Sequence, residues 1–179
     1  MQASSPASQS EPAQATPVRW TVSRFDAFSP ADLYALLRLR SAVFVVEQAC
    51  AFQDLDDADQ QALHVQGHIA DRLVACARCS GPGVKYPEAS IGRIATHLEA
   101  RGRGLGHLLV DRSIAVIASN WGAQSIRIGA QTRLQRFYEQ HGFQDAGLPY
   151  IEDGIAHLEM LRHASVSPAF PADGREPTP

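Results

Sequence analysis

Hydrophobic positions recur with the period of an amphipathic helix in residues 105–121. Leu105, Leu108 and Leu109 fall at i, i+3 and i+4, which places them on one face of a helix. A short apolar run, Ile91–Thr96, precedes this pattern and predicts a strand. The chain is therefore expected to be organised around a strand that leads, through a short loop, into a helix.

The loop between them, Arg101–Gly106, reads Arg-Gly-Arg-Gly-Leu-Gly. A helix start leaves backbone N–H groups unpaired and carries partial positive charge, and glycines let an anion approach the backbone closely. These features predict a phosphate cradle, to which Arg101 and Arg103 add charge. A P-loop would need a Lys after its last glycine, but the only Lys is Lys85. A dinucleotide fingerprint would need an acid about 20 residues further on, where Ser125–Ile128 has none. A glycine-rich turn without a ligand is the remaining alternative.

The rest of the chain alternates between strand and helix patterns. Ser29 and Pro30 are typical of a helix start, and Gly142 followed by Phe143 is typical of a helix end. The order of expected elements is strand, helix, three strands, helix, strand, helix and two strands. The expected bounds are strand 20–25, helix 30–44, strands 63–69, 73–79 and 91–96, helix 105–121, strand 125–130, helix 131–141, and strands 148–150 and 155–161.

Composition and charge narrow the class of protein. The 179 residues are 45% hydrophobic and 20% charged, which is typical of a globular protein. Residues 1–18 and 164–179 are poor in apolar positions, so we expect two flexible tails around one domain at 19–163. A net charge of −3 disfavours nucleic-acid partners, and no apolar run is long enough to cross a membrane. Three cysteines suit a reducing cytoplasm.

Two further patterns have competing interpretations. Cys76 and Cys79 resemble half of a metal or redox motif, but residues three apart on a strand point to opposite faces, so we expect structural thiols and no metal. The segment Glu47–Asp59 holds five acids and no basic residue. It is either a solvated acidic loop or an electrostatic site for a cationic acceptor. Glu47 follows the apolar run Val43–Val46, which would raise the pKa of its carboxyl group.

Several separate blocks, taken together, resemble the GNAT-fold N-acetyltransferases, and within them the ElaA-like branch. The glycine loop fits the [Q/R]-x-x-G-x-[G/A] pattern through Arg101, Gly104 and Gly106. Leu98 stands where many members carry a proline. The other matching blocks are residues 36–40, 43–48, 53–56, 91–93, 129–131, 137–139, 142–143 and 152–157.

The resemblance implies an α+β GNAT fold, with a splayed, mostly antiparallel sheet of six to seven strands flanked by helices. It implies acetyl-CoA as co-substrate and no metal. The pyrophosphate would bind the glycine loop, and the pantetheine would pair with the strand edge at Ile94–Thr96. The implied cofactor-binding residues are Ile94, Ala95, Thr96, Arg101, Gly102, Arg103, Gly104, Leu105, Gly106, Gln131 and Phe137.

The implied reaction is acetyl transfer to a primary amine by direct attack in a ternary complex. Tyr138 would give a proton to the departing thiolate, although it also lies on the helical face of Leu134 and would pack there in any case. Glu47 is the candidate base, and His64 and His157 are lower-ranked relays. The acceptor-binding residues would be Asp54, Asp56, Glu152, Asp153 and His157. The alternative function is a non-catalytic acyl-CoA-binding module, and a homodimer is left open.

Overall fold

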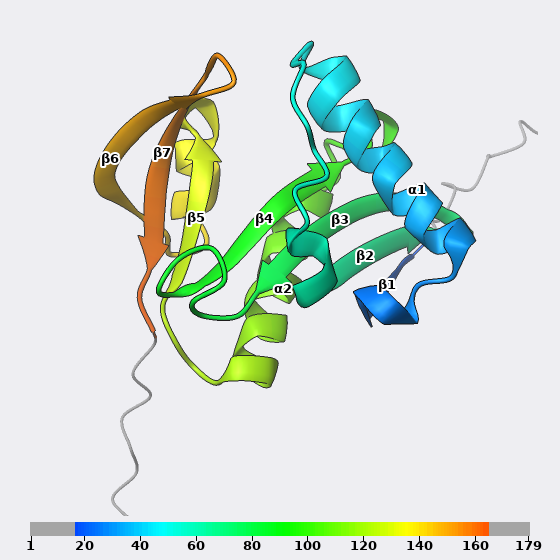
Figure 1. Ribbon diagram of the computed structural model, residues 1–179, viewed down its shortest axis with the longest axis horizontal. Helices are drawn as coiled ribbons and strands as arrows, with labels where there is room; N and C mark the ends of the chain where they lie inside the picture. Colours follow the sequence, from blue (N-terminus) through cyan, green and yellow to red (C-terminus); the bar gives the residue numbers. More distant parts are fainter. Residues whose placement is uncertain (1–16, 165–179) are drawn as a thin grey trace, which may run out of the picture.

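Seven strands form one sheet in the order β1-β2-β3-β4-β5-β7-β6 (Figure 1). The computed structural model describes residues 17–164. All neighbouring strands are antiparallel except β4 and β5, which are parallel, so the predicted fold class is confirmed. The strands are β1 (Val18–Arg24), β2 (Leu63–Ile69), β3 (Arg72–Ser80), β4 (Ala89–Thr96), β5 (Ile126–Gln131), β6 (Gln144–Glu152) and β7 (Ile155–Arg162).

Helices α1 (Pro30–Arg40), α2 (Leu105–Trp121) and α3 (Gln135–Glu139) flank the sheet. Helix α1 starts where it was predicted to start, because the Ser29 hydroxyl accepts the backbone N–H of Asp32. It continues directly into a π-helix, η2 (Ser41–Glu47). Short 3₁₀ turns are η1 (Phe25–Ala27), η3 (Ala58–Gln61), η4 (Leu98–Ala100) and η5 (Thr132–Leu134).

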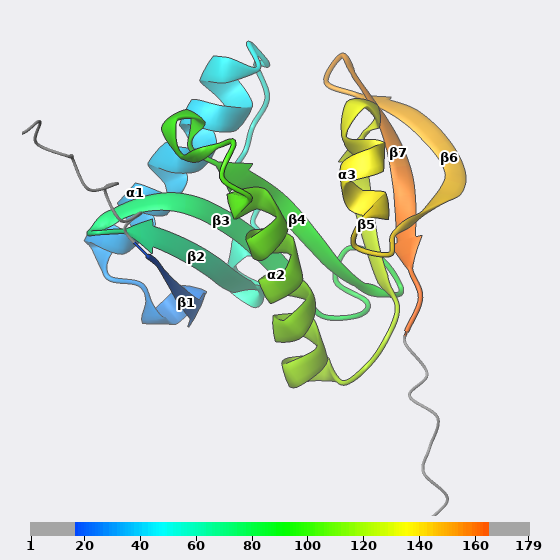
Figure 2. The same cartoon turned by 180° about the vertical axis from the view of Figure 1, so that it is seen from behind.

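The two halves of the sheet part between β4 and β5. These strands pair at only two positions, Ala89 with Ile126 and Ser90 with Arg127. Beyond Ser90 the two strands diverge, as Figure 2 shows. The expected splay is therefore present, and among residues 17–164 the far part of β4 pairs with a strand on one side only, through β3. A free strand edge of this kind is able to pair with an extended ligand.

Two apolar clusters lie on opposite faces of the sheet. The larger one packs α2 and α3 against the sheet, and the smaller one packs α1 on β3 and β4 (Figures 1 and 2). Cys79 belongs to the first cluster and Cys76 to the second, so these thiols face away from each other as predicted. Burial raises the pKa of both to about 12. On α2, Leu105 and Leu109 are buried, whereas Leu108 is exposed and was wrongly assigned to the apolar face.

Some element bounds differ from the prediction. The helix expected over 131–141 is shorter, because β5 extends to Gln131 and a 3₁₀ turn precedes α3. Gly142 closes it in the left-handed conformation, at φ +81°, as expected of a helix end. Strand β6 is longer than predicted, because its pairing with β7 continues through a register shift.

Strand β1 starts at Val18, one residue before the expected start of the domain at residue 19. The rest of the expected tails, 1–16 and 165–179, lies outside the described residues. Within residues 17–164, no helix is long and apolar enough to cross a membrane.

Candidate active site

The glycine loop sits where β4 ends and α2 begins. Gly102 and Gly104 have φ values of +76° and +74°, a left-handed backbone that favours glycine. Gly104 is the N-cap of α2 and has no side chain that could bind the free N–H groups of the first turn. A Cβ atom on Gly106 would lie 3.4 Å from the ring of Phe137, so the loop also packs closely on α3. The loop thus has the glycine backbone and the helix start on which the predicted cradle depends, and phosphate binding there stays a prediction.

Arg101 is engaged with protein groups. Its guanidinium donates two hydrogen bonds to the Glu47 carboxylate, at 2.7 and 2.8 Å. It also binds the backbone oxygen of Thr96, at 2.9 and 3.0 Å. Arg101 therefore connects η2 to the end of β4, and its charge is largely neutralised. Arg103 is exposed, and it remains the loop arginine available to an anion.

Glu47 does not have the environment that was expected for a base. Its hydrogen bonds and ion pair with Arg101 lower the pKa of its carboxyl group. The side chain is partly exposed rather than enclosed by Val43–Val46. The expectation that an apolar setting raises this pKa is therefore wrong, because an arginine 54 residues away in sequence reaches the carboxylate.

Tyr138 is buried on α3, with 7% of its surface exposed. Its ring makes edge contacts with Phe137 and Phe143, at centroid distances of 5.0 and 6.1 Å. Burial raises the pKa of Tyr138 to about 12, so its phenol is protonated at neutral pH. A protonated phenol is a proton donor, so this position suits both the predicted acid role and a packing role.

The acidic segment forms a buried network of three arginines and three aspartates. Arg40 binds Asp54 and Asp59, at 2.8 and 2.7 Å, and only 1% of its surface is exposed. Arg78 binds Asp56 and Asp59, at 2.6 and 3.1 Å. Arg93 lies 2.8 Å from Asp54 and 3.1 Å from Asp56. We call these six residues the Arg–Asp cluster.

The cluster bears on both interpretations of the acidic segment. Asp54 and Asp59 are buried, so they are not part of a solvated loop. The carboxylates of Asp54 and Asp56 each contact two arginines. Hydrogen bonds from Arg78 hold the pKa of Asp56 well below its usual range. Asp54 is enclosed among these arginines, whereas 34% of the Asp56 side chain is exposed, and acceptor binding at Asp56 stays a prediction. His64 is also structural, since its ring is buried against the Asp59 carbonyl and burial lowers its pKa.

Three polar side chains lie next to one another on β5, β7 and β6, on the side of the sheet that faces α1. Gln131 on β5, His157 on β7 and Tyr150 on β6 form one row across three strands. The amide of Gln131 donates to Gln48, just after η2, at 3.0 Å. Gln131 therefore lies beside His157 and not at the glycine loop. Phe137, in contrast, packs beside Gly106, the position expected of a cofactor-binding residue. We call Gln131, Tyr150 and His157 the cross-strand row.

The turn at Glu152–Asp153 meets the segment that follows η2. The thiol of Cys50 lies 3.5 Å from the backbone oxygen of Asp153. Glu152 is exposed, and its carboxylate lies 3.8 Å from Nε2 of His157. Two segments about 100 residues apart in sequence therefore flank the open end of the splay.

Comparison with known proteins identifies the family. A model described as the acetyltransferase (GNAT) domain matches residues 38–163. The chain belongs to the GNAT acetyltransferase family. Protein ElaA of Escherichia coli K12 is 37% identical over 147 residues, which cover 81% of this chain and 96% of ElaA. A UPF0039 protein of Synechocystis is 38% identical over 145 residues, 80% of this chain and 94% of that protein.

Solved structures agree with this assignment. The crystal structure of Escherichia coli ElaA matches with a TM-score of 0.77 at 36% identity, over 82% of this chain and all of ElaA. An acyl-CoA N-acyltransferase from Pseudomonas aeruginosa matches with a TM-score of 0.78 at 34% identity, over 82% and 99% of the two chains. The predicted ElaA-like branch is confirmed, and family membership implies an acyl-CoA-dependent acyltransferase.

Some contacts of β5 were not predicted from the sequence. Tyr150 lies over Gly129, so that a Cβ at Gly129 would overlap the tyrosine hydroxyl. Arg127 lies between Glu88 and Glu159, at 2.7 and 2.9 Å. A signal was present for Tyr150, since Gly129 interrupts a strand and thereby marks a close approach. No local pattern connects Glu88 to Arg127, which are 39 residues apart.

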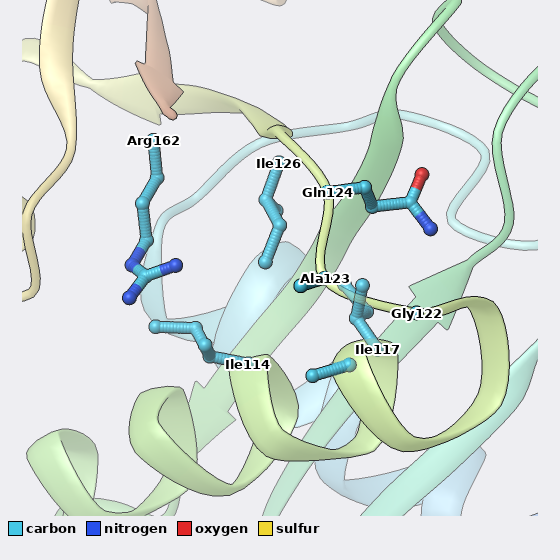
Figure 3. Close-up of a pocket in the computed structure, with 8 residues that line it drawn as sticks. Ile114, Ile117, Gly122, Ala123, Gln124, Ile126 and Arg162 are labelled. Atoms are coloured by element: carbon cyan, nitrogen blue, oxygen red, sulfur yellow. The ribbon is translucent and has the colours of Figure 1, made fainter. Parts of the chain in front are cut away.

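A small hollow lies away from the GNAT site. It lies between the C-terminal half of α2 and the start of β5 and measures about 160 Å³ (Figure 3). Ile114, Ile117 and Ile126 line it, and Arg162 stands at its edge (Figure 3). The guanidinium of Arg162 is bound to the carbonyl of His141. Neither the glycine loop nor Tyr138 lines this space, so it does not coincide with the predicted cofactor-binding residues.

Proposed function

We propose that this GNAT protein is an N-acetyltransferase that transfers an acetyl group from acetyl-CoA to a primary amine. The observation that carries the proposal is the parting of β4 from β5 directly beside the uncapped start of α2. A free strand edge and a set of unpaired N–H groups there suit the pantetheine and the pyrophosphate of one extended ligand. The free thiols of Cys50, Cys76 and Cys79 are in keeping with a cytoplasmic enzyme.

The chemistry follows from the groups at the two ends of this site. Acetyl-CoA is the co-substrate and brings a thioester, whose carbonyl carbon an amine attacks. A backbone N–H of β4 would stabilise the oxyanion that develops. Tyr138 would protonate the departing thiolate, since its phenol is protonated at neutral pH. Glu47 would act as a positioning residue that holds Arg101 at the end of β4.

A screen of amine acceptors with detection of free CoA tests the activity. The panel should contain polyamines, aminoacyl compounds and peptides with a free N-terminus or a lysine. Release of CoA that depends on a primary amine is expected, and the matching alcohols should not react. CoA binding without turnover by any member of the panel would instead support the alternative, a non-catalytic acyl-CoA-binding module.

The proposed phosphate cradle leads to a second prediction, which concerns CoA affinity. Gly106→Glu should weaken CoA binding by at least about tenfold, because the new side chain is crowded by Phe137 and brings negative charge to an anion site. Isothermal titration calorimetry with CoA measures the change. Gly106→Gln separates size from charge. Ser119→Glu adds the same charge at an exposed position of α2 and should leave affinity unchanged. Equal affinity in wild type and a folded Gly106→Glu variant would rule out the cradle.

A further inference from the structure

We infer that His157 is the base that removes a proton from the acceptor ammonium. The inference rests on the proposed function and deepens it, because it assigns a step for which Glu47 has the wrong environment. It depends on four observations: the hydrogen bond of the ring, its neighbours, its place at the splay, and the pairing of nearby carboxylates.

The hydrogen bond of the His157 ring determines which nitrogen is free. Nδ1 lies 2.9 Å from the backbone oxygen of Ile155. A carbonyl oxygen only accepts hydrogen bonds, so Nδ1 must carry the hydrogen. In the neutral ring, Nε2 then holds a lone pair. Within residues 17–164 no hydrogen-bond donor contacts Nε2, and the nearest charged group is the Glu152 carboxylate, at 3.8 Å.

Two side chains lie beside the His157 ring. The Glu152 carboxylate is 3.8 Å from Nε2. The ring of Tyr150 stacks on the imidazole, with centroids 5.4 Å apart and planes at 24°, so it presents its π-face to the ring. Only 8% of the His157 surface is exposed, which holds the ring in one orientation. A carboxylate and an aromatic face are therefore the groups that a positive charge on this ring would meet.

The position of His157 suits an acceptor rather than CoA. The cross-strand row lies at the end of β5, five residues along from the first pair with β4, where the two halves of the sheet have parted. Gln131 connects this row to Gln48, across the open end of the splay. Tyr138 lies on α3, which packs with α2 on the other face of the sheet, whereas the cross-strand row lies on the α1 side. The base and the proposed acid would therefore act from opposite faces of the sheet.

Nearby carboxylates are already paired with arginines. Glu47 is bound to Arg101 through both oxygens. Glu88 and Glu159 share Arg127. The aspartates of the Arg–Asp cluster are bound to their own arginines. Glu152 lies 3.8 Å from His157 and has no arginine partner among the described residues, so it is the rival base that the experiment must separate from His157.

The protons balance over the whole reaction. The acceptor ammonium has three protons on nitrogen, and the product amide keeps one. Nε2 of His157 takes the first and passes it to solvent, which frees the lone pair that forms the C–N bond. The nitrogen of the tetrahedral intermediate then loses a second proton to solvent. The intermediate collapses, the C–S bond breaks and the thiolate takes a proton from Tyr138, whose phenolate regains one from solvent.

The decisive variant is His157→Asn. The amide N–H of asparagine takes the place of Nδ1–H and keeps the bond to Ile155, while the basic Nε2 is lost. We expect kcat/KM with an amine identified by the screen to fall about 10²- to 10⁴-fold at neutral pH. The acidic limb of the pH–rate profile should disappear, and CoA affinity should not change. His163→Asn makes the same substitution at an exposed histidine and should behave as wild type.

Glu152→Gln separates the two candidates. If His157 is the base, removing this carboxylate should shift the acidic limb to lower pH, because the imidazolium loses its partner, and the rate above the limb should be kept. The other polar groups near the row and the turn, namely Tyr150, Glu159, Cys50, Asp153 and Arg133, which binds Gln131, are the same in both variants. Loss of the limb in Glu152→Gln, with full activity in His157→Asn, would overturn the inference and leave the proposed function intact.

An independent readout needs no substrate. Nitrogen-15 NMR of the imidazoles should show His157 as the Nδ1–H tautomer when it is neutral, and an Nε2–H tautomer would overturn the inference. Turnover of no amine by wild type, in contrast, would overturn the proposed function and the base assignment together. The two failures are therefore distinguishable.

Discussion

Tyr138→Phe is expected to lower kcat by about 10²- to 10⁴-fold, the usual range for a positioned acid. The reason is that a thiolate leaves more readily when it receives a proton, and the phenol, with a pKa raised to about 12 by burial, is protonated throughout the neutral range. Phenylalanine keeps the edge contacts with Phe137 and Phe143, so packing should be preserved. Steady-state kinetics with saturating acetyl-CoA and amine measures the effect.

The control for this variant is Tyr34→Phe, at a tyrosine on α1 that is 70% exposed. It removes the same hydroxyl and should leave kcat unchanged. CoA affinity should be equal in wild type and both variants, because the cradle is formed by backbone groups. If Tyr138→Phe turns over as fast as wild type, Tyr138 is a packing residue of the α3 core and the acid lies elsewhere.

The strand, glycine loop and helix could be predicted because their signals are local. Glycines, a strand before them and a helix after them all lie within residues 91–121, and a helix start attracts anions in any fold. The left-handed backbone at Gly102 and Gly104 is the same kind of local consequence. For this reason the strand-loop-helix order, the helix start at Ser29 and the helix end at Gly142 are all present in the structure.

The charges of the site could not be predicted, because their partners are distant in sequence. Glu47 and Arg101 are 54 residues apart, and Asp54 and Arg93 are 39 apart. In the sequence, a run of acids without a basic neighbour is typical of a solvated surface. The arginines that pair with these acids come from other elements of the fold, so the sequence does not show them beside the run. The direction of each pKa shift therefore depends on tertiary contacts. For Glu47 the pKa is lowered, whereas the sequence predicted that it would be raised.

The arrangement of the residues proposed to receive the acceptor depends on strand register, which a single sequence does not determine. The cross-strand row exists because Gln131 pairs with His157 and Tyr150 pairs with the same histidine. A slip of one residue in either pairing would turn these side chains to the opposite face. The predicted turn at Glu152–Asp153 was found, but the stacking of Tyr150 on His157 required the register of both pairs.

The Arg–Asp cluster links the stability of the fold to the strand edge at Ile94–Thr96, where we expect the cofactor to bind. Arg93 has φ +50°, an unusual backbone for a non-glycine residue, and sits at the irregular pairing of β3 with β4. Asp54 and Asp56 hold its guanidinium there. This bulge directly precedes Ile94–Thr96, the edge that we expect to pair with pantetheine. Loss of the cluster should therefore weaken the fold and loosen this edge together.

Arg40→Met is expected to lower the free energy of unfolding by about 3–5 kcal/mol, the cost of removing one partner from a buried ion pair. Methionine fills much of the space, but the carboxylates of Asp54 and Asp59 are left buried without the Arg40 charge. Urea unfolding followed by circular dichroism measures the change. Arg38→Met, at an exposed arginine on the same helix, should change stability by less than about 0.5 kcal/mol.

The pH dependence gives an independent test of the same cluster. Burial alone would raise the pKa of Asp59, but hydrogen bonds and charges from Arg40 and Arg78 outweigh it and lower the pKa. The pKa of Asp56 is lowered as well. Groups with a lowered native pKa stabilise the fold fully above the unfolded value of about 3.9, and this contribution is lost as pH falls further. Wild-type stability should therefore fall steeply below about pH 4, and the slope should be smaller in Arg40→Met. Equal unfolding midpoints and equal slopes in wild type, Arg40→Met and Arg38→Met would show that the cluster contributes nothing to stability, because an uncompensated buried carboxylate must either cost free energy or take up a proton.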